Sequence, residues 1–437
     1  MTQAPAVREL LRRVEQGGAL SCAGICASAQ PFLAALLHQN YPTRPIVIVT
    51  DNLKAQESFQ QDIETWLNVG RESRVESREP AAAGEDSGSR PSSLDSRPLF
   101  FPAWEILPHE GKLPPADVIS DRLETLLALS QLSTLNSQPS TLLVTSVTAL
   151  QQKTYAPADL KERTRQLARG ERTDPLDLVE WLEAQGYEPE AQVTQKGELA
   201  MRGGIVDVFP PTSPWPVRLE FFGDELESLR YFDPLTQISR EEITSVTLPP
   251  AGELGILKSQ VASPESKVAK LATLLDHLPK KTIFLLCEPE QLAAAADEYA
   301  QQIPTGDPFF VSWGAFVGEL DARGMTRVAL SDDEFTSPDL SDILSSVDAE
   351  REGVRGASLF ASLDAFRPLG ERAPELQIAE AQRREFFAQL HRWLRQDYSV
   401  HVFCNNDGER QRFEEVWAET GNGRGSRVEG RELDSHA

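Results

Sequence analysis

The sequence predicts an α/β protein whose parallel sheet is interrupted by a strand-rich insertion and followed by a partial further α/β unit. Short apolar, β-branched runs alternate with helical patterns, and runs that are apolar on both faces are typical of strands buried in a parallel sheet. The expected strands are PIVIVT (45–50), STLLVTS (140–146), KTIFLLCEP (281–289) and SVHVFCN (399–405). The expected helices are 7–18, 31–39, 53–67, 176–187 and 384–396.

Composition divides the chain into four expected units, in keeping with a length of 437 residues. Residues 71–97 are rich in Ser, Gly, Pro and charge, so we expect a flexible insertion there. After about residue 151 the pattern changes to an α+β module, and it changes back near Pro249. The units are 1–154, 155–250, 251–380, and 381–437, the last being the start of a further α/β domain with an unstructured tail.

Charge and cysteine content exclude several classes of protein. A net charge of −24 argues against a protein that mainly binds nucleic-acid backbone, because that requires a basic surface. Four scattered cysteines indicate reduced thiols rather than a disulfide framework; they are Cys22, Cys26, Cys287 and Cys404. No apolar run is as long as a membrane span and no signal-peptide pattern opens the chain, so we expect a cytoplasmic protein.

The stretch LSCAGICASAQPF (20–32) lies where an α/β nucleotide-binding domain would place its phosphate loop. A working P-loop needs glycines, a lysine for the β/γ-phosphates, and Ser or Thr for magnesium. Here Ala29, Gln30 and Pro31 stand where Gly-Lys-Thr is expected. The loop positions are Gly24, Ser28, Ala29 and Gln30. On spacing alone, an ordinary loop before a helix is the simpler interpretation.

The stretch 201–239 predicts an antiparallel meander, with turns at Gly223–Asp224 and Asp233–Pro234. Alternation places one set of side chains on a packed face and the next set on the opposite face. The packed set is Val217, Leu219 and Phe221, and the opposite set is Arg218, Glu220 and Phe222. The opposite face is either an ordinary solvated surface or a protein-interaction hot spot, since Phe and Arg are enriched in interfaces.

This meander resembles domain 2 of the excision-repair protein UvrB, and more closely its counterpart in the transcription-repair coupling factors (Mfd). The segment FPAWEILPHEGKLPPADVISDRLETLLAL (101–129) also resembles a pattern of that family, and weaker agreement extends over residues 1–415. UvrB fits less well, because it has an intact Gly-Lys-Thr loop. Its tyrosine-rich hairpin is replaced here by the stretch containing Trp104 and Pro108.

The resemblance implies a helicase-like domain 1 (1A at 1–154, 1B at 251–380) interrupted by domain 2 at 155–250. It implies that the loop at 20–32 is a degenerate P-loop, and that domain 2 binds UvrA through Arg202, Arg218 and Phe222. We expect these three on two strands joined by a turn, and we expect truncation of Arg218 or Phe222 to leave stability unchanged.

The full family also has an RNA-polymerase-binding domain and a DNA-translocating ATPase motor. Neither GxxxxGK[ST] nor Asp-Glu-x-His occurs in this sequence. We therefore expect a chain without catalytic residues, cofactor or metal, which would reach RNA polymerase and DNA only through segments not in this sequence. A truncated product, a split gene or a fragment would all fit.

Two alternatives remain open: a nucleotide-hydrolysing motor, and a UvrB-like repair protein that binds DNA or nucleotide directly. The missing lysine and Walker B carboxylates disfavour the motor. For DNA, the basic patch would be KERTRQLARGER (161–172), but it carries acids and no aromatic residue for base stacking. The pattern of His109, His277, His391 and His401 does not indicate a metal site.

Overall fold

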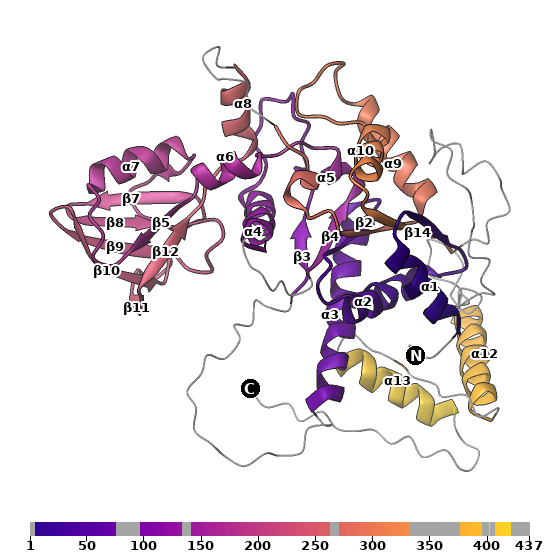
Figure 1. Ribbon diagram of the computed structural model, residues 1–437. Helices are drawn as coiled ribbons and strands as arrows, with labels where there is room; N and C mark the ends of the chain where they lie inside the picture. Colours follow the sequence, from indigo (N-terminus) through magenta and orange to yellow (C-terminus); the bar gives the residue numbers. More distant parts are fainter. Residues whose placement is uncertain are drawn as a thin grey trace. The chain divides into compact units, whose positions relative to one another are not determined.

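The computed structural model describes residues 5–75, 97–132, 141–262, 271–332, 376–395, 402 and 407–420 (Figure 1). The chain divides into two compact units, Met1–Phe360 and Ala361–Ala437. The first unit contains a six-stranded parallel sheet and a separate, mainly antiparallel sheet, each with its own helices. The predicted α/β class is therefore confirmed. Among the described helices, none is both long and apolar enough to cross a membrane.

The parallel sheet has the strand order β1-β14-β13-β2-β4-β3, and every neighbouring pair is parallel. Its strands are β1 (Ala19–Cys22), β2 (Ile46–Thr50), β3 (Leu99–Phe101), β4 (Leu142–Ser146), β13 (Ile283–Cys287) and β14 (Thr326–Leu330). Every residue of β2, β4 and β13 is buried, which confirms the prediction that these three strands are enclosed on both faces. Every residue of β14, which was not predicted, is buried as well. Because β13 pairs with β2, chain from both sides of the insertion forms one sheet.

Helices cover both faces of this sheet (Figure 1). Alternate residues of β2 enter opposite cores: Ile46 and Ile48 pack with α1, α2 and α3, whereas Val47 and Val49 pack with α4, α5, α8, α9 and α10. The first group is α1 (Pro5–Gln16), α2 (Gln30–Asn40) and α3 (Leu53–Val75). The second is α4 (Ala116–Leu132), α5 (Val147–Leu150), α8 (Leu254–Ala262), α9 (Pro289–Gln301) and α10 (Trp313–Ala322).

The second sheet has the order β11-β10-β9-β8-β7-β6, antiparallel except where β6 pairs with β7. Its strands are β6 (Glu188–Pro189), β7 (Glu198–Arg202), β8 (Ile205–Val208), β9 (Val217–Phe222), β10 (Glu225–Phe232) and β11 (Ser239–Ile243). The predicted meander is confirmed, because β8, β9 and β10 are consecutive antiparallel neighbours.

One face of this sheet is buried beneath α7 (Pro175–Ala184) and a two-stranded sheet of β5 (Arg165–Ala168) and β12 (Ser245–Leu248). The helix α6 (Pro157–Glu162) precedes β5. The polar stretch at 161–172 thus contributes a strand whose Leu167 is completely buried, rather than a continuous solvated face.

Two expectations fall partly outside the described residues. The helix α3 continues to Val75, so residues 71–75 of the expected insertion are helical, whereas 76–96 lie outside the described ranges. In the second unit, α12 (Leu376–Arg395) and α13 (Asp407–Thr420) pack through an aromatic cluster that includes Phe387. The expected strand at 399–405 and Cys404 lie outside the described residues, apart from Val402.

Candidate functional site

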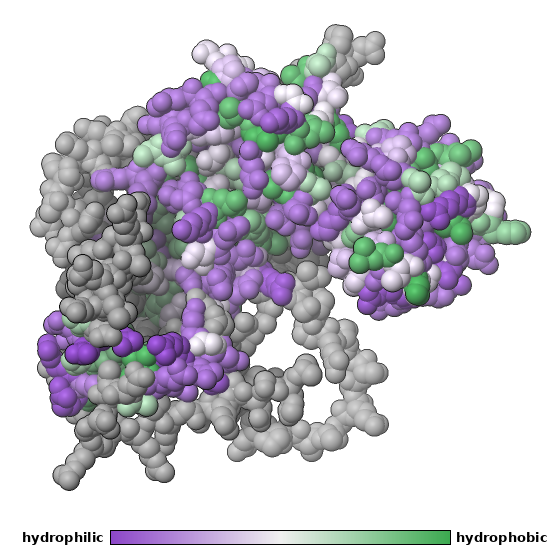
Figure 2. Space-filling view, turned by 180° about the vertical axis from the view of Figure 1, so that it is seen from behind, coloured by the Kyte–Doolittle hydropathy of each residue, from purple (hydrophilic) through white to green (hydrophobic). Residues whose placement is uncertain are grey.

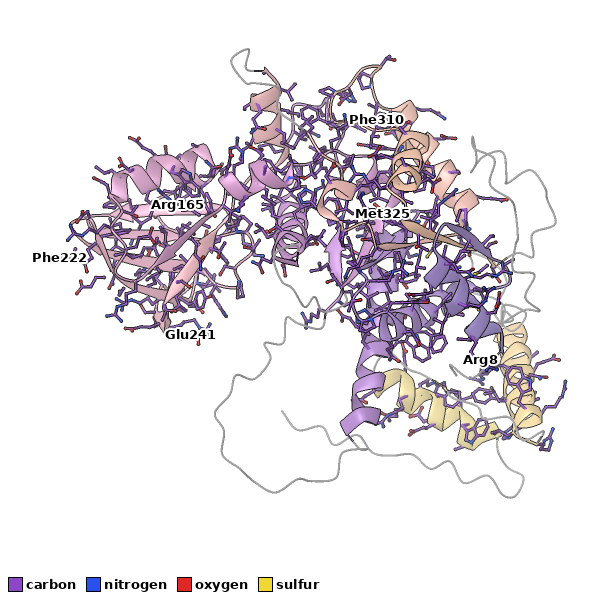
Figure 3. All side chains as sticks on the ribbon, in the orientation of Figure 1. Arg8, Arg165, Phe222, Glu241, Phe310 and Met325 are labelled. Atoms are coloured by element: carbon purple, nitrogen blue, oxygen red, sulfur yellow. The ribbon has the colours of Figure 1, made fainter. Side chains whose placement is uncertain are left out.

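The strand β9 separates its side chains onto two faces as the alternation predicts. Val217 and Leu219 are completely buried, and Phe221 is half-buried against the same core. Phe222 is 80% exposed, and Figure 3 shows it at the tip of the antiparallel-sheet domain, pointing away from the sheet. We call the opposite side of the sheet the outer face. Its polar and aromatic residues include Arg202, Asp207, Arg218, Glu220, Phe222 and Arg230.

The strand register places Arg202, Arg218 and Phe222 on this face, but the two strands that carry them are not neighbours. Arg202 on β7 pairs with Ile205 on β8, and Ile205 pairs with Glu220 on β9. Cross-strand partners share a face, so Arg202 lies on the same face as Arg218 and Phe222. The expectation of two strands joined by a turn was wrong, because β8 lies between β7 and β9.

Arg218 is held by a carboxylate of its own sheet. Its Nε and Nη2 donate to Oδ1 and Oδ2 of Asp207 at 2.7 and 2.8 Å, and its guanidinium lies 4.7 Å from the ring centroid of Phe232. The hydrogen bond to Asp207 raises the pKa of Arg218. Asp207 is only 3% exposed, so truncating Arg218 would leave a buried carboxylate without its cation. Because of this contact we now expect truncation of Arg218 to lower stability, in place of the unchanged stability expected from the sequence.

A second ion pair lies beside the first on the outer face. Glu220 accepts hydrogen bonds from the Ser228 hydroxyl and from Arg230 Nη2, which lie on β10. Together these bonds keep the pKa of Glu220 below its ordinary value. Sequence reasoning missed Asp207 and Arg230 as parts of this face. Their charge and their place in the same alternation were the available signals.

The turn between β7 and β8 lies against the end of β9 through Gly204. The carbonyl of Gly204 accepts a hydrogen bond of 2.8 Å from the Phe221 N–H, and a Cβ at Gly204 would lie 2.8 Å from the Phe221 oxygen. Only glycine permits this approach, since carbon and oxygen atoms do not pack that closely. Arg202 itself is exposed, and its Nη2 donates to the Ala191 carbonyl at 2.6 Å.

The expected degenerate P-loop has the form of a strand, a loop and a helix. Gly24 has φ +70°, a short 3₁₀ turn covers Ala27–Ala29, and α2 begins at Gln30. Ser28 lies 3.4 Å from the Cys26 sulfur, and Gln30 is only 2% exposed. The loop positions supply no cation in place of the P-loop lysine.

The cysteines and two of the histidines among the described residues are buried or packed against other side chains of the fold. Cys22, Cys26 and Cys287 are buried free thiols, as the sequence predicts, and burial raises the pKa of Cys22 to about 11. The buried His277 bonds the Tyr155 carbonyl, and His391 stacks on Trp417. Within the described ranges, no group of three or more His, Cys, Asp or Glu residues is placed to hold a metal ion.

Two large side chains of the motif at 101–129 lie in the core, whereas residues 111–113 of the motif are exposed. Trp104 and Arg122 are both completely buried, and the Arg122 guanidinium lies 4.9 Å from the Trp104 ring centroid. These side chains are not exposed to a nucleic acid. Figure 2 shows apolar and polar side chains interspersed over the visible surface of the antiparallel-sheet domain.

Comparison with known families places the antiparallel sheet in a defined class. Residues 166–254 match the family described as the UvrB interaction domain. The match covers β6 to β11, including the whole outer face, together with α7 and β12. The antiparallel-sheet region of the chain is therefore similar to the UvrB interaction domain family.

Similarity to individual proteins identifies a narrower group than the family match does. The chain is similar to the transcription-repair-coupling factor of Haemophilus influenzae, with 30% identity over 46% of this chain and 20% of the relative. The transcription-repair-coupling factor of Myxococcus xanthus is 29% identical over 63% of this chain and 21% of the relative. That of Escherichia coli is 36% identical over 36% of this chain and 13% of the relative. These matches confirm the resemblance to transcription-repair coupling factors, and they span about a fifth or less of the length of these relatives.

Proposed function

We propose that this chain recruits the damage-recognition ATPase UvrA through its outer face. It would act as the UvrA-binding module of a cytoplasmic transcription-repair coupling factor, linking stalled transcription to nucleotide excision repair. The observation that carries the proposal is Phe222, an 80% exposed aromatic side chain on a rigid strand of the domain that matches the UvrB interaction family. Interface hot spots are enriched in aromatic residues and arginine.

Arg202, Arg218 and Phe222 have different roles in this proposal. Phe222 supplies the apolar anchor that loses water on binding, and Arg202 supplies an exposed guanidinium for a carboxylate of UvrA. Arg218 contributes less directly. Its bidentate pair with Asp207 fixes its orientation, so it offers its remaining donors without first losing conformational freedom.

The wider activities of the relatives are also proposals for this chain. RNA polymerase and DNA would be engaged through parts of a coupling factor other than residues 1–437, and the chain itself would not hydrolyse ATP. The proposed units keep the boundaries 1–154, 155–250, 251–380 and 381–437. The alternative is a UvrB-like repair protein that binds DNA or nucleotide directly. The net charge of −24 and the burial of Leu167 within the basic stretch favour the UvrA proposal over it.

Binding to immobilised UvrA, measured by surface plasmon resonance with the full chain, tests the proposal. We expect Phe222→Ala and Arg202→Ala each to weaken binding by about tenfold or more with an unchanged circular dichroism spectrum. Leu235→Ala is the matched apolar control, because Leu235 is 87% exposed in the turn after β10. Arg8→Ala, on the exposed side of α1, is the matched charge control.

Both controls should bind UvrA as the unchanged chain does. Equal binding by Phe222→Ala and Leu235→Ala would rule out the outer face as the UvrA site. Salt-dependent retardation of DNA by the chain, or measurable ATP turnover, would instead support the alternative.

A further inference from the structure

The residue at the lysine position of the degenerate P-loop makes a specific buried contact. Gln30 is 2% exposed, and its Nε2 donates to the Ile25 carbonyl within the loop at 3.2 Å. The same nitrogen donates to Oε1 of Glu288 at 2.6 Å. The side chain that replaces the lysine therefore still contacts an anionic oxygen, but the oxygen belongs to this chain.

Glu288 also receives a backbone donor from a third segment. The Asp332 N–H lies 3.2 Å from Oε1 and 3.4 Å from Oε2 of the same carboxylate. Gln30, Glu288 and Asp332 follow β1, β13 and β14, which are adjacent in the sheet order β1-β14-β13. Their meeting point is the carboxyl edge of the parallel sheet, where open α/β sheets bind their ligands.

The backbone of Glu288 is an independent sign that its side chain is held in place. Glu288 has φ 52° and ψ 72°, the left-handed conformation that residues with a Cβ adopt only at a cost. Such strain persists where the surrounding contacts determine it. The Glu288 N–H is fixed by the Leu330 carbonyl at 2.8 Å, and its carboxylate by Gln30 and Asp332.

We infer that the loop after β1 is an anion site whose ligand is the Glu288 carboxylate of the same chain. A carboxylate accepts side-chain amide and backbone N–H donors as a phosphate oxygen does. The Glu288 carboxylate therefore links the loops after β1, β13 and β14, as a bound nucleotide phosphate could do in an intact P-loop. The carboxylate excludes a nucleotide phosphate because it fills the position and carries the same sign of charge. The missing lysine is a further reason against phosphate binding. This inference is independent of the UvrA proposal.

Anion rescue tests the inference in the full chain. Glu288→Ala empties the carboxylate position, and we expect it to lower the unfolding temperature of the parallel-sheet domain by about 3 °C or more in chloride. Sodium acetate at the same ionic strength should then recover at least about half of that loss, because a free carboxylate can bind the Gln30 and Asp332 donors. Differential scanning calorimetry measures both effects.

Three variants serve as controls. Glu290→Ala removes an exposed carboxylate two positions away and should show neither the loss nor the rescue. Gln30→Ala combined with Glu288→Ala should lose the rescue, because the side-chain donor is gone. Glu288→Gln keeps an acceptor oxygen and should show a smaller loss without rescue.

If Glu288→Ala does not fold in chloride, Glu288→Gly provides the same comparison, since glycine also relieves the left-handed strain. The inference is overturned if acetate stabilises the unchanged chain, Glu290→Ala and the Glu288 variants equally. It is also overturned if the double variant with Gln30→Ala is rescued as well as the single variant.

Discussion

Arg122 and Glu253, both completely buried, are joined by two hydrogen bonds across 131 residues of sequence. Arg122 Nε donates to Oε2 of Glu253 at 2.7 Å, and Nη2 donates to Oε1 at 3.0 Å. Trp104 Nε1 and the Thr154 hydroxyl donate to the same carboxylate at 2.8 and 2.6 Å. The motif at 101–129 thus fixes the chain at the point where it leaves the antiparallel-sheet domain and enters α8.

Arg122→Ala should lower the free energy of unfolding by about 3–5 kcal/mol, because it leaves the Glu253 carboxylate buried without its cation. Urea denaturation followed by tryptophan fluorescence measures this. Arg163→Ala is the matched control, since the Arg163–Asp159 pair is partly exposed and lies within one helical turn. We expect that control to cost less than about 1 kcal/mol. Equal costs would show that the Arg122 pair is not a buried structural contact.

Arg218→Ala should reduce both stability and UvrA affinity, unlike Phe222→Ala, which should reduce affinity alone. The stability loss is expected to be about 2–4 kcal/mol, because Asp207 is left buried and unpaired. Combining Arg218→Ala with Asp207→Ala should restore part of this loss, and thermal melts of the two variants measure it. No difference between the single and double variants would argue against the pair as the cause.

Gly204→Ala should weaken UvrA binding by about tenfold while the domain stays folded. The added Cβ would lie 2.8 Å from the Phe221 oxygen, so the turn that carries Arg202 must move away from β9. Gly203→Ala is the control, because a Cβ there meets no atom within 4 Å and adds only the strain of φ +62°. Surface plasmon resonance should rank the Gly204 variant well below the Gly203 variant, and the reverse order would contradict the role of this close approach.

Asp121, on α4, should make stability depend on pH in a defined direction. Burial, followed by the nearby Glu124, raises its pKa from 3.8 to about 6. The folded state therefore holds the proton more tightly than the unfolded state, and ionisation destabilises the fold as pH rises from about 4 to above 6. Asp121→Asn should thus stabilise the chain at pH 7.5 by at most about 1 kcal/mol, since solvent screens a half-exposed carboxylate.

At about pH 4 the advantage of Asp121→Asn should have largely disappeared, because the unchanged side chain is then protonated in the folded state. Glu124→Gln offers an independent check: it should lower the pKa of Asp121, measured by NMR titration of the side-chain carboxyl carbon. A constant advantage of Asp121→Asn at both pH values would contradict the raised pKa.

Local sequence patterns correctly predicted the elements with strong periodicity. The apolar runs at 45–50, 140–146 and 281–289 form buried parallel strands, and alternation placed Leu219 inside and Phe222 outside. These features are predictable because the backbone fixes the direction of successive side chains, with a period of two in a strand. Three strands of the parallel sheet were not predicted from the sequence. β1 (ALSC) and β3 (LFF) have only four and three residues, and β14 (TRVAL) begins with the polar residues Thr326 and Arg327.

The partners of the charged and polar residues were decided by the tertiary structure. Asp207 neutralises Arg218 from a neighbouring strand, Glu253 meets Arg122 across 131 residues, and Glu288 meets Gln30 across 258. A residue's hydrophobicity and its position in the periodic pattern of a helix or strand indicate which face it occupies. They do not indicate which distant segment packs against that face. The order of strands in the sheet decides that, because it alone brings the ends of β1, β13 and β14 together.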